Sequence, residues 1–347
     1  MTSVVLAVDG NSLVHRAYHA QARTGAVSTD GRPTWAVRGL LMQLVAAVDR
    51  VRPSRVVVGF DDPDASLRRE RWPQYKAHRT DKLDTLVEQL SYAVEQVRRL
   101  GVNVVVPPGL EADDVLASTA AQAAAAGGRT VVVTSDRDAF ALIDDATSVL
   151  RIINGGVDAS PMMTAERLVL LLGVRPAQYR DFAALRGDPS DNLPGVRGVG
   201  PRTAARLLGE FGSARAAFDD LDAVRERVGA GVAARLGEAG AREAWELNCQ
   251  VMTMRSDVPL DLDRGRLPLD AAAVAAVFRG QQLVWTVNDA LCVLAGADPD
   301  RLAGPPPAEP SWSDPADPGS DPSWTGYRRA SLPRLVPRAE SAQLALF

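Results

Sequence analysis

The chain has 347 residues, of which 46% are hydrophobic and 24% charged, and its formal net charge at pH 7 is −4. This composition supports a sizeable folded core and excludes a disordered or collagen-like chain. Cys249 and Cys292 form no C-x-x-C pair, and neither a signal peptide nor a membrane-spanning apolar stretch is present, so the sequence predicts a soluble cytoplasmic protein without thiolate zinc.

Short β-branched runs alternate with helical patterns over the first 150 residues. Strands are predicted at residues 4–8, 56–60, 102–106 and 130–134, and helices at 34–50, 83–100 and 113–126. The strand runs are almost continuously apolar, which is typical of strands with both faces buried. The β-α-β-α order predicts an α/β fold with a mostly parallel central sheet and helices on both faces.

Composition divides the chain into three predicted regions. Residues 1–163 form the α/β domain, and residues 164–298, where the pattern turns helical, form a second region. Nine of the 23 prolines lie between Pro305 and Pro337 among Ser, Asp and Gly. Such a stretch buries too little apolar surface to order itself, so residues 299–347 are predicted to be a disordered tail.

Acidic residues follow each predicted strand. They are Asp9, Asp61, the trio Glu111, Asp113 and Asp114, and the pair Asp136 and Asp138. Singly, each has an ordinary explanation, since Asp9 precedes a possible turn at Gly10-Asn11 and acids favour helix starts. Together they lie where parallel strands end, at one edge of the sheet, and seven close carboxylates need protons or cations.

Oxygen-rich sites of this kind favour Mg²⁺ or Mn²⁺. Two divalent cations would bring the formal charge from −4 to zero, so the charge does not exclude a nucleic-acid partner. Two metals suit phosphodiester hydrolysis, because they activate water and stabilise the leaving oxygen without a Ser-His-Asp triad. The three histidines, His15, His19 and His78, are best explained as helix-face or loop residues.

A basic segment at residues 67–82 carries six Arg or Lys against two acids, with Trp72 and Tyr75 interleaved. Basic side chains bind phosphates and aromatic rings stack on bases, although an exposed charged helix or loop is the alternative. Both lysines of the chain, Lys76 and Lys82, lie here, whereas the other 37 basic residues of the chain are all arginines. A position that needs a compact charge on a phosphate would keep lysine, which makes Lys76 a catalytic candidate.

Residues 195–200 read Gly-Val-Arg-Gly-Val-Gly and precede a helical run. The pattern predicts a helix-hairpin-helix at about 187–212, in which glycines let backbone N–H groups approach a duplex phosphate without reading base sequence. An ordinary glycine-rich loop is the alternative. Asp188 and Asp191 come immediately before it and would couple this anchor to the metal site.

Six stretches together carry a family resemblance. They are residues 8–20, 60–61, 71–79, 111–115, 135–138 and 187–200, in this order within roughly residues 1–295. The set resembles the 5′ nuclease family, which includes the 5′-3′ exonuclease domain of bacterial DNA polymerase I, phage 5′ nucleases and flap endonucleases. No polymerase-like domain follows, so a stand-alone nuclease is expected.

The resemblance implies two metal sites and a helical arch over about residues 67–90. The first metal site would be surrounded by Asp9, Asp61, Glu111, Asp113 and Asp114, and the second by Asp136, Asp138, Asp188 and Asp191. Lys76 and Arg79 would meet the scissile phosphate, and a monovalent cation such as K⁺ would sit near Gly195 to Gly200. The expected DNA contacts are Arg16, Arg68, Arg69, Arg71, Tyr75, Lys82, Gly195, Gly198, Gly200, Arg202 and Thr203.

The last five residues, Gln343-Leu344-Ala345-Leu346-Phe347, resemble the bacterial sliding-clamp-binding peptide, with Gln343, Leu344, Leu346 and Phe347 as the docking side chains. At the end of a disordered tether, such a peptide can bind a hydrophobic groove while the folded part stays mobile. A frayed apolar terminus is the alternative.

The sequence therefore predicts a nucleoid-associated, two-metal 5′ nuclease that cuts 5′ flaps and 5′ ends near junctions of single- and double-stranded DNA, including RNA-primer flaps. A catalytically weak junction-binding scaffold tethered to the clamp is a second hypothesis. A PIN-like ribonuclease is a third, but it leaves the glycine motif unexplained.

Overall fold

A computed structural model describes residues 3–79 and 82–302. The expected tail beyond residue 302 and the clamp-like peptide at 343–347 lie outside these ranges. Up to Leu302 the described chain forms one compact unit. Across the same ranges, every helix is too short or too polar to cross a lipid bilayer.

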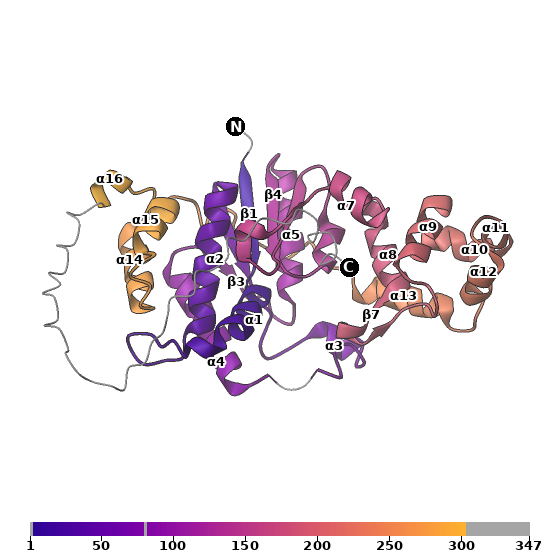
Figure 1. Cartoon of the computed structure of the whole chain (residues 1–347), viewed down its shortest axis with the longest axis horizontal. Coiled ribbons are helices and arrows are strands. Elements are labelled where there is room, and N and C mark those ends of the chain that lie inside the picture. The colour runs from indigo at the N-terminus through magenta and orange to yellow at the C-terminus, as the bar shows by residue number, and fades with distance from the viewer. Residues whose placement is uncertain (1–2, 80–81, 303–347) are drawn as a thin grey trace, which may run out of the picture. The chain divides into compact units, whose positions relative to one another are not determined.

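A six-stranded sheet forms the centre of this unit, in the order β3-β2-β1-β4-β5-β6. Strands β1, β3 and β4 of this sheet are labelled in Figure 1. The strands are β1 (Val4–Asp9), β2 (Arg55–Gly59), β3 (Asn103–Val105), β4 (Arg129–Thr134), β5 (Thr147–Arg151) and β6 (Met162–Met163). The first five run parallel and β6 is antiparallel, which confirms the predicted sheet. β5 and β6 were not predicted, because β5 has only two apolar side chains among its five residues and β6 has only two residues.

Alternate side chains of each strand face opposite layers of helices. Leu6 and Val8 pack into the core formed with α1 (Gly10–Gln21), α2 (Trp35–Val51) and α4 (Asp84–Arg99). Val5 packs on the other face with Val115 of α5 (Ala112–Ala125). Helices α2, α4 and α5 agree with the predicted positions, whereas α1 was not predicted. Together the four helices cover both faces, so the strand ends remain the accessible edge of the sheet.

Helix α1 excludes the alternative explanation for Asp9, since the chain forms no turn at Gly10-Asn11. The helix begins at Gly10, and the Asp9 side chain caps it by accepting a hydrogen bond from the Ser12 backbone N–H at 2.9 Å. Leu13, Val14 and Ala17 are buried on one face of α1. The first acid of the series is thus the last residue of a strand and also a helix N-cap.

Among its described residues, 67–79 and 82, the basic segment contains one short helix before α4. Helix α3 (Leu67–Arg71) is capped by Ser66, and turns follow from residue 73 to 78. The turns lie against a distant loop, because the Lys76 N–H donates to the Asp191 carbonyl at 2.9 Å and the Asn192 side chain donates to the Gln74 carbonyl at 2.8 Å. The segment is therefore fixed to the loop that carries Asp188 and Asp191.

The helical region builds a second core, which includes the buried side chains of Tyr179, Phe182, Leu207 and Trp245. Its helices are α7 (Ala165–Leu172), α8 (Tyr179–Arg186), α9 (Pro201–Phe211), α10 (Ala214–Asp219), α11 (Leu221–Arg227), α12 (Ala230–Leu236) and α13 (Ala241–Val251). Shorter elements are α6 (Gly156–Ala159), α16 (Pro299–Leu302) and the 3₁₀ helices η1 (Ala22–Thr24), η2 (Asp138–Leu142), η3 (Pro176–Gln178) and η4 (Pro189–Asp191).

The loop between α8 and α9 contains a small hairpin of β7 (Gly187–Asp188) and β8 (Leu193–Pro194). Gly187 has φ 73°, and a Cβ added there would lie 2.2 Å from the Gly195 nitrogen. A Cβ on Gly195 would lie 2.1 Å from the Arg186 carbonyl oxygen. These two glycines allow the backbones to cross, whereas Gly200 has open space around it.

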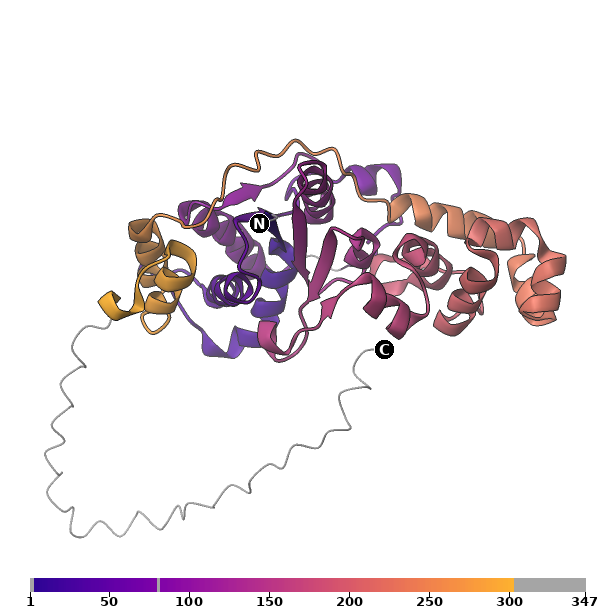
Figure 2. The same ribbon diagram turned by 90° about the horizontal axis from the view of Figure 1, so that it is seen from above.

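Residues 252–268, here called the return segment, lead from α13 back to the sheet (Figure 2). The Arg255 N–H donates to Asp114 at 2.8 Å, and the Val56 N–H donates to the Gly265 carbonyl at 2.9 Å. The chain then forms α14 (Ala271–Gly280) and α15 (Val287–Ala295), which share the core of α2. The boundaries proposed at 163/164 and 298/299 stay predictions.

Candidate metal and nucleic-acid site

The carboxyl edge of the sheet opens into a cleft of about 940 Å³. A second pocket of about 370 Å³ adjoins it, since Ser135 and Asp136 line both. Acids predicted as metal ligands line the two cavities. Asp9, Asp61, Glu111, Asp113 and Asp136 line the cleft, and Asp136, Asp138 and Asp188 line the second pocket.

Asp9 lies at the floor of the cleft, only 5% exposed. One carboxylate oxygen accepts the Ser12 N–H and the other accepts the Thr134 hydroxyl at 2.7 Å. Burial raises the pKa of Asp9 to about 7, and repulsion from Asp61 and Asp136 adds to the shift. The site therefore holds this acid in surroundings that penalise its charge unless a cation is present.

Asp61 is fixed by two neighbours. The Asn11 side chain donates to one of its oxygens at 2.6 Å, and the Ala112 N–H donates to the other at 2.9 Å. Burial raises the pKa of Asp61, and Glu111 adds repulsion. Sequence reasoning missed Asn11, although its place in the first turn after Asp9 was a usable signal.

Asp113 completes the first group from the first turn of α5. Burial raises its pKa well above the ordinary value, and Asp136, Asp9 and Glu111 add repulsion. Repulsion from Asp136 of the second group raises the pKa of both Asp9 and Asp113 of the first group. The two groups of acids therefore interact electrostatically.

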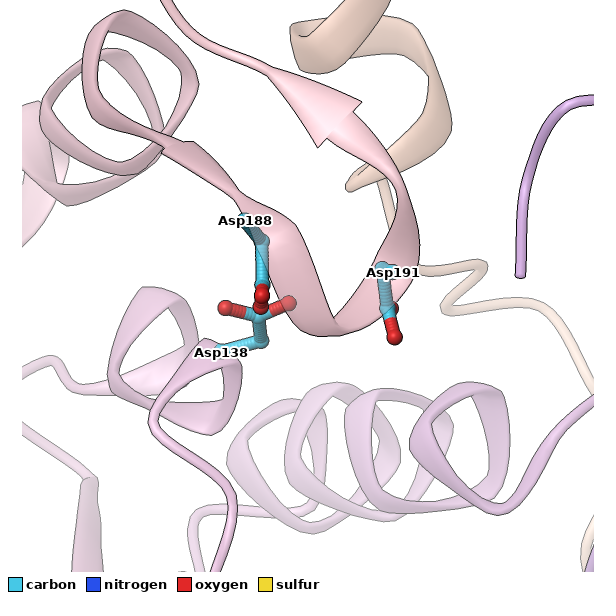
Figure 3. Close-up of side chains that lie close together, drawn as sticks. All are labelled: Asp138, Asp188 and Asp191. Carbon is cyan, nitrogen blue, oxygen red and sulfur yellow. The ribbon is translucent and has the colours of Figure 1, made fainter. Parts of the chain in front are cut away.

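The second group consists of Asp138 from η2, Asp188 from β7 and Asp191 from η4 (Figure 3). One oxygen from each carboxylate lies within 4.8 Å of the others. Burial raises the pKa of Asp138 to about 8, and the neighbouring Asp136, Asp188 and Asp191 add to it. Asp188 is oriented by the backbone N–H and hydroxyl of Ser190, at 2.8 and 2.6 Å.

Asp114 does not belong with the predicted ligands, which corrects the sequence-based assignment. Its side chain is fully buried, and its two oxygens accept bonds from Arg68 at 2.6 and 2.7 Å. They also accept the backbone N–H groups of Glu111 and Arg255 at 3.0 and 2.8 Å. With four donors on two oxygens, no lone pair is left for a metal.

Glu111 accepts hydrogen bonds from three side chains. Its Oε2 accepts bonds from Arg68 at 3.2 Å and from the Tyr75 hydroxyl at 3.1 Å. Its Oε1 accepts a bond from Lys76 Nζ at 3.1 Å. Three residues of the basic segment thus converge on one carboxylate.

The two candidate catalytic cations lie between the acidic groups. Lys76 pairs with Glu111 of the first group, and Arg79 pairs with Asp191 of the second. Both cations line the cleft, together with the exposed Lys82. His15 also lines the cleft. Burial, with a smaller contribution from repulsion by Lys82, lowers the pKa of His15 to about 4, so the imidazole is neutral at pH 7.

The predicted DNA contacts separate into exposed and buried residues. Arg69 and Arg71 are exposed, and Arg16 lines the cleft and donates to Asn154 at 2.8 Å. Tyr75 is buried and Arg68 is largely enclosed, with its side chain 11% exposed, so neither is open to a DNA strand in this conformation. The Tyr75 ring packs with Leu193 and Val251 rather than facing a base.

The helix-hairpin-helix candidates also differ in accessibility. Gly198, Gly200 and Arg202 are exposed and Thr203 is half-buried at the start of α9. Gly195 is instead required for the close crossing with Gly187. Exposed backbone before the N-terminus of α9 is the arrangement that a phosphate contact requires.

The donor set fits divalent cations. All its members are carboxylates, they come from several elements of the fold, and burial and mutual repulsion raise the pKa of several of them. Hard cations prefer exactly such oxygen ligands and offset the repulsion that raises those pKa values.

Comparisons with known proteins agree with this geometry. Residues 4–170 match the family described as 5′-3′ exonuclease, N-terminal resolvase-like domain. Residues 174–274 match the family described as 5′-3′ exonuclease, C-terminal SAM fold. The chain belongs to the 5′-3′ exonuclease family. The resemblance predicted from the motifs is confirmed.

Relatives of this exonuclease family extend the comparison. DNA polymerase I of Mycobacterium tuberculosis is 40% identical over 256 residues, which are 74% of this chain and 28% of that polymerase. The chain thus spans less than a third of that relative. The T5 D15 protein, co-crystallised with metal ions, has a TM-score of 0.58 at 18% identity, covering 82% of this chain and 99% of that one.

A second solved structure shares the same fold. The catalytic core of Rad2 in complex with DNA substrate has a TM-score of 0.54 at 15% identity, covering 85% of this chain and 92% of that one. The family match and these folds agree with the predicted nuclease class.

Proposed function

We propose that the chain is a structure-selective, divalent-metal-dependent 5′ nuclease. It hydrolyses DNA phosphodiesters near junctions of single and double strands, as a 5′-flap endonuclease and a 5′-3′ exonuclease in replication and repair. One observation carries the proposal. Seven of the carboxylates predicted as metal ligands line two adjoining pockets, Asp191 lies beside Asp138 and Asp188, and Lys76 and Arg79 each pair with one of the two acidic groups.

The first metal would be held by Asp9, Asp61, Glu111 and Asp113, and the second by Asp136, Asp138, Asp188 and Asp191. When bound, Mg²⁺ or Mn²⁺ would activate water and stabilise the leaving oxygen. Asn11, Thr134 and Ser12 hold the Asp61 and Asp9 carboxylates in place through hydrogen bonds.

Lys76 and Arg79 would bind the phosphate to be cut. Lys76 offers a compact charge and Arg79 a planar fork, and each is within reach of one acidic group. The cations would neutralise the phosphate charge while the substrate approaches an acidic cleft. Their present carboxylate partners would then be free for the metals.

Duplex DNA would bind at the loop before α9. Gly198, Gly200 and Arg202 are exposed there, and K⁺ at this loop would add positive charge for a phosphate. The support is the family match in this region and the similar fold of Rad2, which was solved with a DNA substrate. RNA-primer flaps are a further proposed substrate.

The bacterial sliding clamp is the proposed protein partner. The support is sequence alone, since Gln343 to Phe347 resemble a clamp-binding peptide and lie outside the described residues. A nucleoid association would follow from binding DNA and clamp.

The deciding experiment is single-turnover cleavage of a 5′-flap DNA at low salt, with Mn²⁺ or Mg²⁺ and an EDTA control, resolving product lengths. Metal-dependent incision near the junction supports the proposal. Tight binding without cleavage in either metal contradicts it and supports the scaffold hypothesis. Preferential cleavage of RNA without regard to a junction would favour the PIN-like alternative.

A further inference from the structure

We propose that Tyr75 and Arg68 are positioning residues for Glu111 and do not contact DNA. The inference rests on the proposed function, in which Glu111 is a metal ligand. It assigns to two members of the basic segment a role inside the protein, which their sequence pattern does not indicate.

Tyr75 reaches Glu111 from a fixed place in the interior. Its side chain is 5% exposed, and its ring packs with Leu193 and Val251. Its hydroxyl donates to Glu111 Oε2 at 3.1 Å. A ring held by packing can place a donor with little freedom to move.

Arg68 approaches the same oxygen from α3. Its Nη1 lies 3.2 Å from Glu111 Oε2, and both terminal nitrogens bond Asp114 at 2.7 and 2.6 Å. Its remaining donors bond the carbonyls of Val251 and Thr253 at 3.2 and 3.1 Å. Because each nitrogen of the guanidinium already donates to an acceptor inside the protein, the guanidinium has no free donor for a phosphate.

Asp114 completes the arrangement, because it also accepts the Glu111 backbone N–H at 3.0 Å. Arg68 therefore holds Glu111 directly and through Asp114. The two donors occupy Oε2, so Glu111 can offer Oε1 to the cleft, where Lys76 now binds it. Glu111 would then present one defined oxygen to a metal once Lys76 moves to the phosphate.

The test compares Tyr75→Phe and Arg68→Lys with the neighbouring exposed Arg69→Met as the matched control. Tyr75→Phe removes only the hydroxyl and keeps the packed ring. Three quantities are measured: Mn²⁺ binding by calorimetry without DNA, flap-DNA affinity in EDTA, and the Mn²⁺ dependence of single-turnover cleavage. Removal of groups that orient metal ligands weakens metal binding by about 10- to 100-fold in known sites.

We expect Tyr75→Phe to weaken Mn²⁺ binding by about tenfold and to raise the Mn²⁺ concentration for half-maximal cleavage, while DNA affinity stays within about twofold. Arg68→Lys should act in the same direction and more strongly. Arg69→Met should reduce DNA affinity and leave Mn²⁺ binding unchanged.

The opposite pattern overturns the inference. If Tyr75→Phe and Arg68→Lys reduce DNA affinity while Mn²⁺ binding stays unchanged, both residues are DNA contacts. If Arg68→Lys fails to fold, Tyr75→Phe decides alone. Calorimetry without DNA keeps the inference separate from the proposed function, because a wild-type protein that binds Mn²⁺ but cuts no flap would contradict only the latter.

Discussion

The ammonium of Lys76 lies 3.1 Å from Glu111 Oε1, while the backbone N–H of Lys76 donates to the Asp191 carbonyl at 2.9 Å. One residue therefore touches both acidic groups, through its side chain and its main chain. It does so with φ 55°, a left-handed conformation that is unusual for a side-chain-bearing residue. The bond to Asp191 holds this conformation in place.

Replacing Lys76 with Met should affect cleavage far more than DNA binding. The ammonium is the proposed charge on the scissile phosphate, and loss of such a group lowers the rate by about 100- to 1,000-fold. DNA affinity in EDTA should change by less than about tenfold, because many other phosphate contacts remain. The measurement is single-turnover cleavage beside binding isotherms. Lys82→Met, which removes the other lysine, is the control, and an unimpaired rate in Lys76→Met would remove Lys76 from the mechanism.

Replacing Asp188 with Asn should weaken metal binding and stabilise the metal-free fold. Asp188 contributes to the raised pKa of Asp138, so neutralising it relieves repulsion. Loss of a group that only orients a metal ligand weakens metal binding by about 10- to 100-fold. Because Asp188 is itself a proposed ligand, Mn²⁺ affinity should fall by at least about tenfold in Asp188→Asn. Calorimetry and thermal unfolding with and without Mn²⁺ measure both effects. The exposed Asp222→Asn is the control, and an unchanged Mn²⁺ affinity in Asp188→Asn would exclude it as a ligand.

The metal-free protein should lose stability as pH rises. Burial and neighbouring acids raise the pKa of Asp9 to about 7 and of Asp138 to about 8. In the unfolded chain the pKa of Asp is about 4, so the folded state binds these protons more tightly than the unfolded state does. The stability that these protons contribute is therefore lost as the pH rises from about 4 to about 8.

Divalent cations should reverse this trend, because they replace the protons. The rise in Tm on adding Mn²⁺ should be larger at about pH 8 than at about pH 5.5. Thermal unfolding in EDTA and in Mn²⁺ across this range measures the difference. A Tm increment that does not depend on pH would mean that the acids are ionised in the metal-free protein.

Two glycines of the same motif should respond differently to alanine. Gly195→Ala places a Cβ 2.1 Å from the Arg186 carbonyl, so we expect a loss of about 1–3 kcal/mol in the free energy of unfolding. Gly200 has open space, so Gly200→Ala should keep stability within about 1 kcal/mol and weaken duplex binding instead. Chemical denaturation and duplex binding measure the two effects. Equal stability of the two variants would contradict the crossing at Gly187.

Deleting residues 343–347 should leave cleavage of free flap DNA unchanged. Affinity for a bacterial sliding clamp should fall by at least about tenfold, since the proposed anchor is lost. Surface-immobilised clamp measures the affinity, and a chain with Leu344 and Phe347 changed to Ala is the matched control for length. Unchanged clamp affinity in both variants would rule out the peptide.

The sequence predicted the parallel sheet and the carboxylate edge because both follow from local pattern. Val-rich runs identify buried strands, and an acid after each strand must lie near the others once the strands are parallel. This reasoning does not apply to Asp188 and Asp191, because they follow no strand of this sheet. Only the family resemblance predicted them as ligands of the second metal.

What could not be predicted depends on contacts between distant segments. Arg68 and Arg69 are neighbours of the same residue type, so local sequence does not distinguish them. Only the contact of Arg68 with Asp114, 46 positions away, makes it a largely enclosed positioning residue, whereas Arg69 stays exposed. Tyr75 likewise suggested base stacking, because nothing local indicated that Leu193 and Val251 would cover its ring. Asp114 looked like Asp113 for the same reason.

The return segment sets the order in which the protein can be completed during synthesis. The apolar face of α2 is covered partly by α14 and α15, which are made more than 200 residues later. Until residue 295 has left the ribosome, the part of α2 that α14 and α15 cover is exposed to solvent. Contacts between residues so far apart in the sequence also form slowly. A nascent chain stopped at residue 274, where the second family match ends, would therefore expose part of its own core.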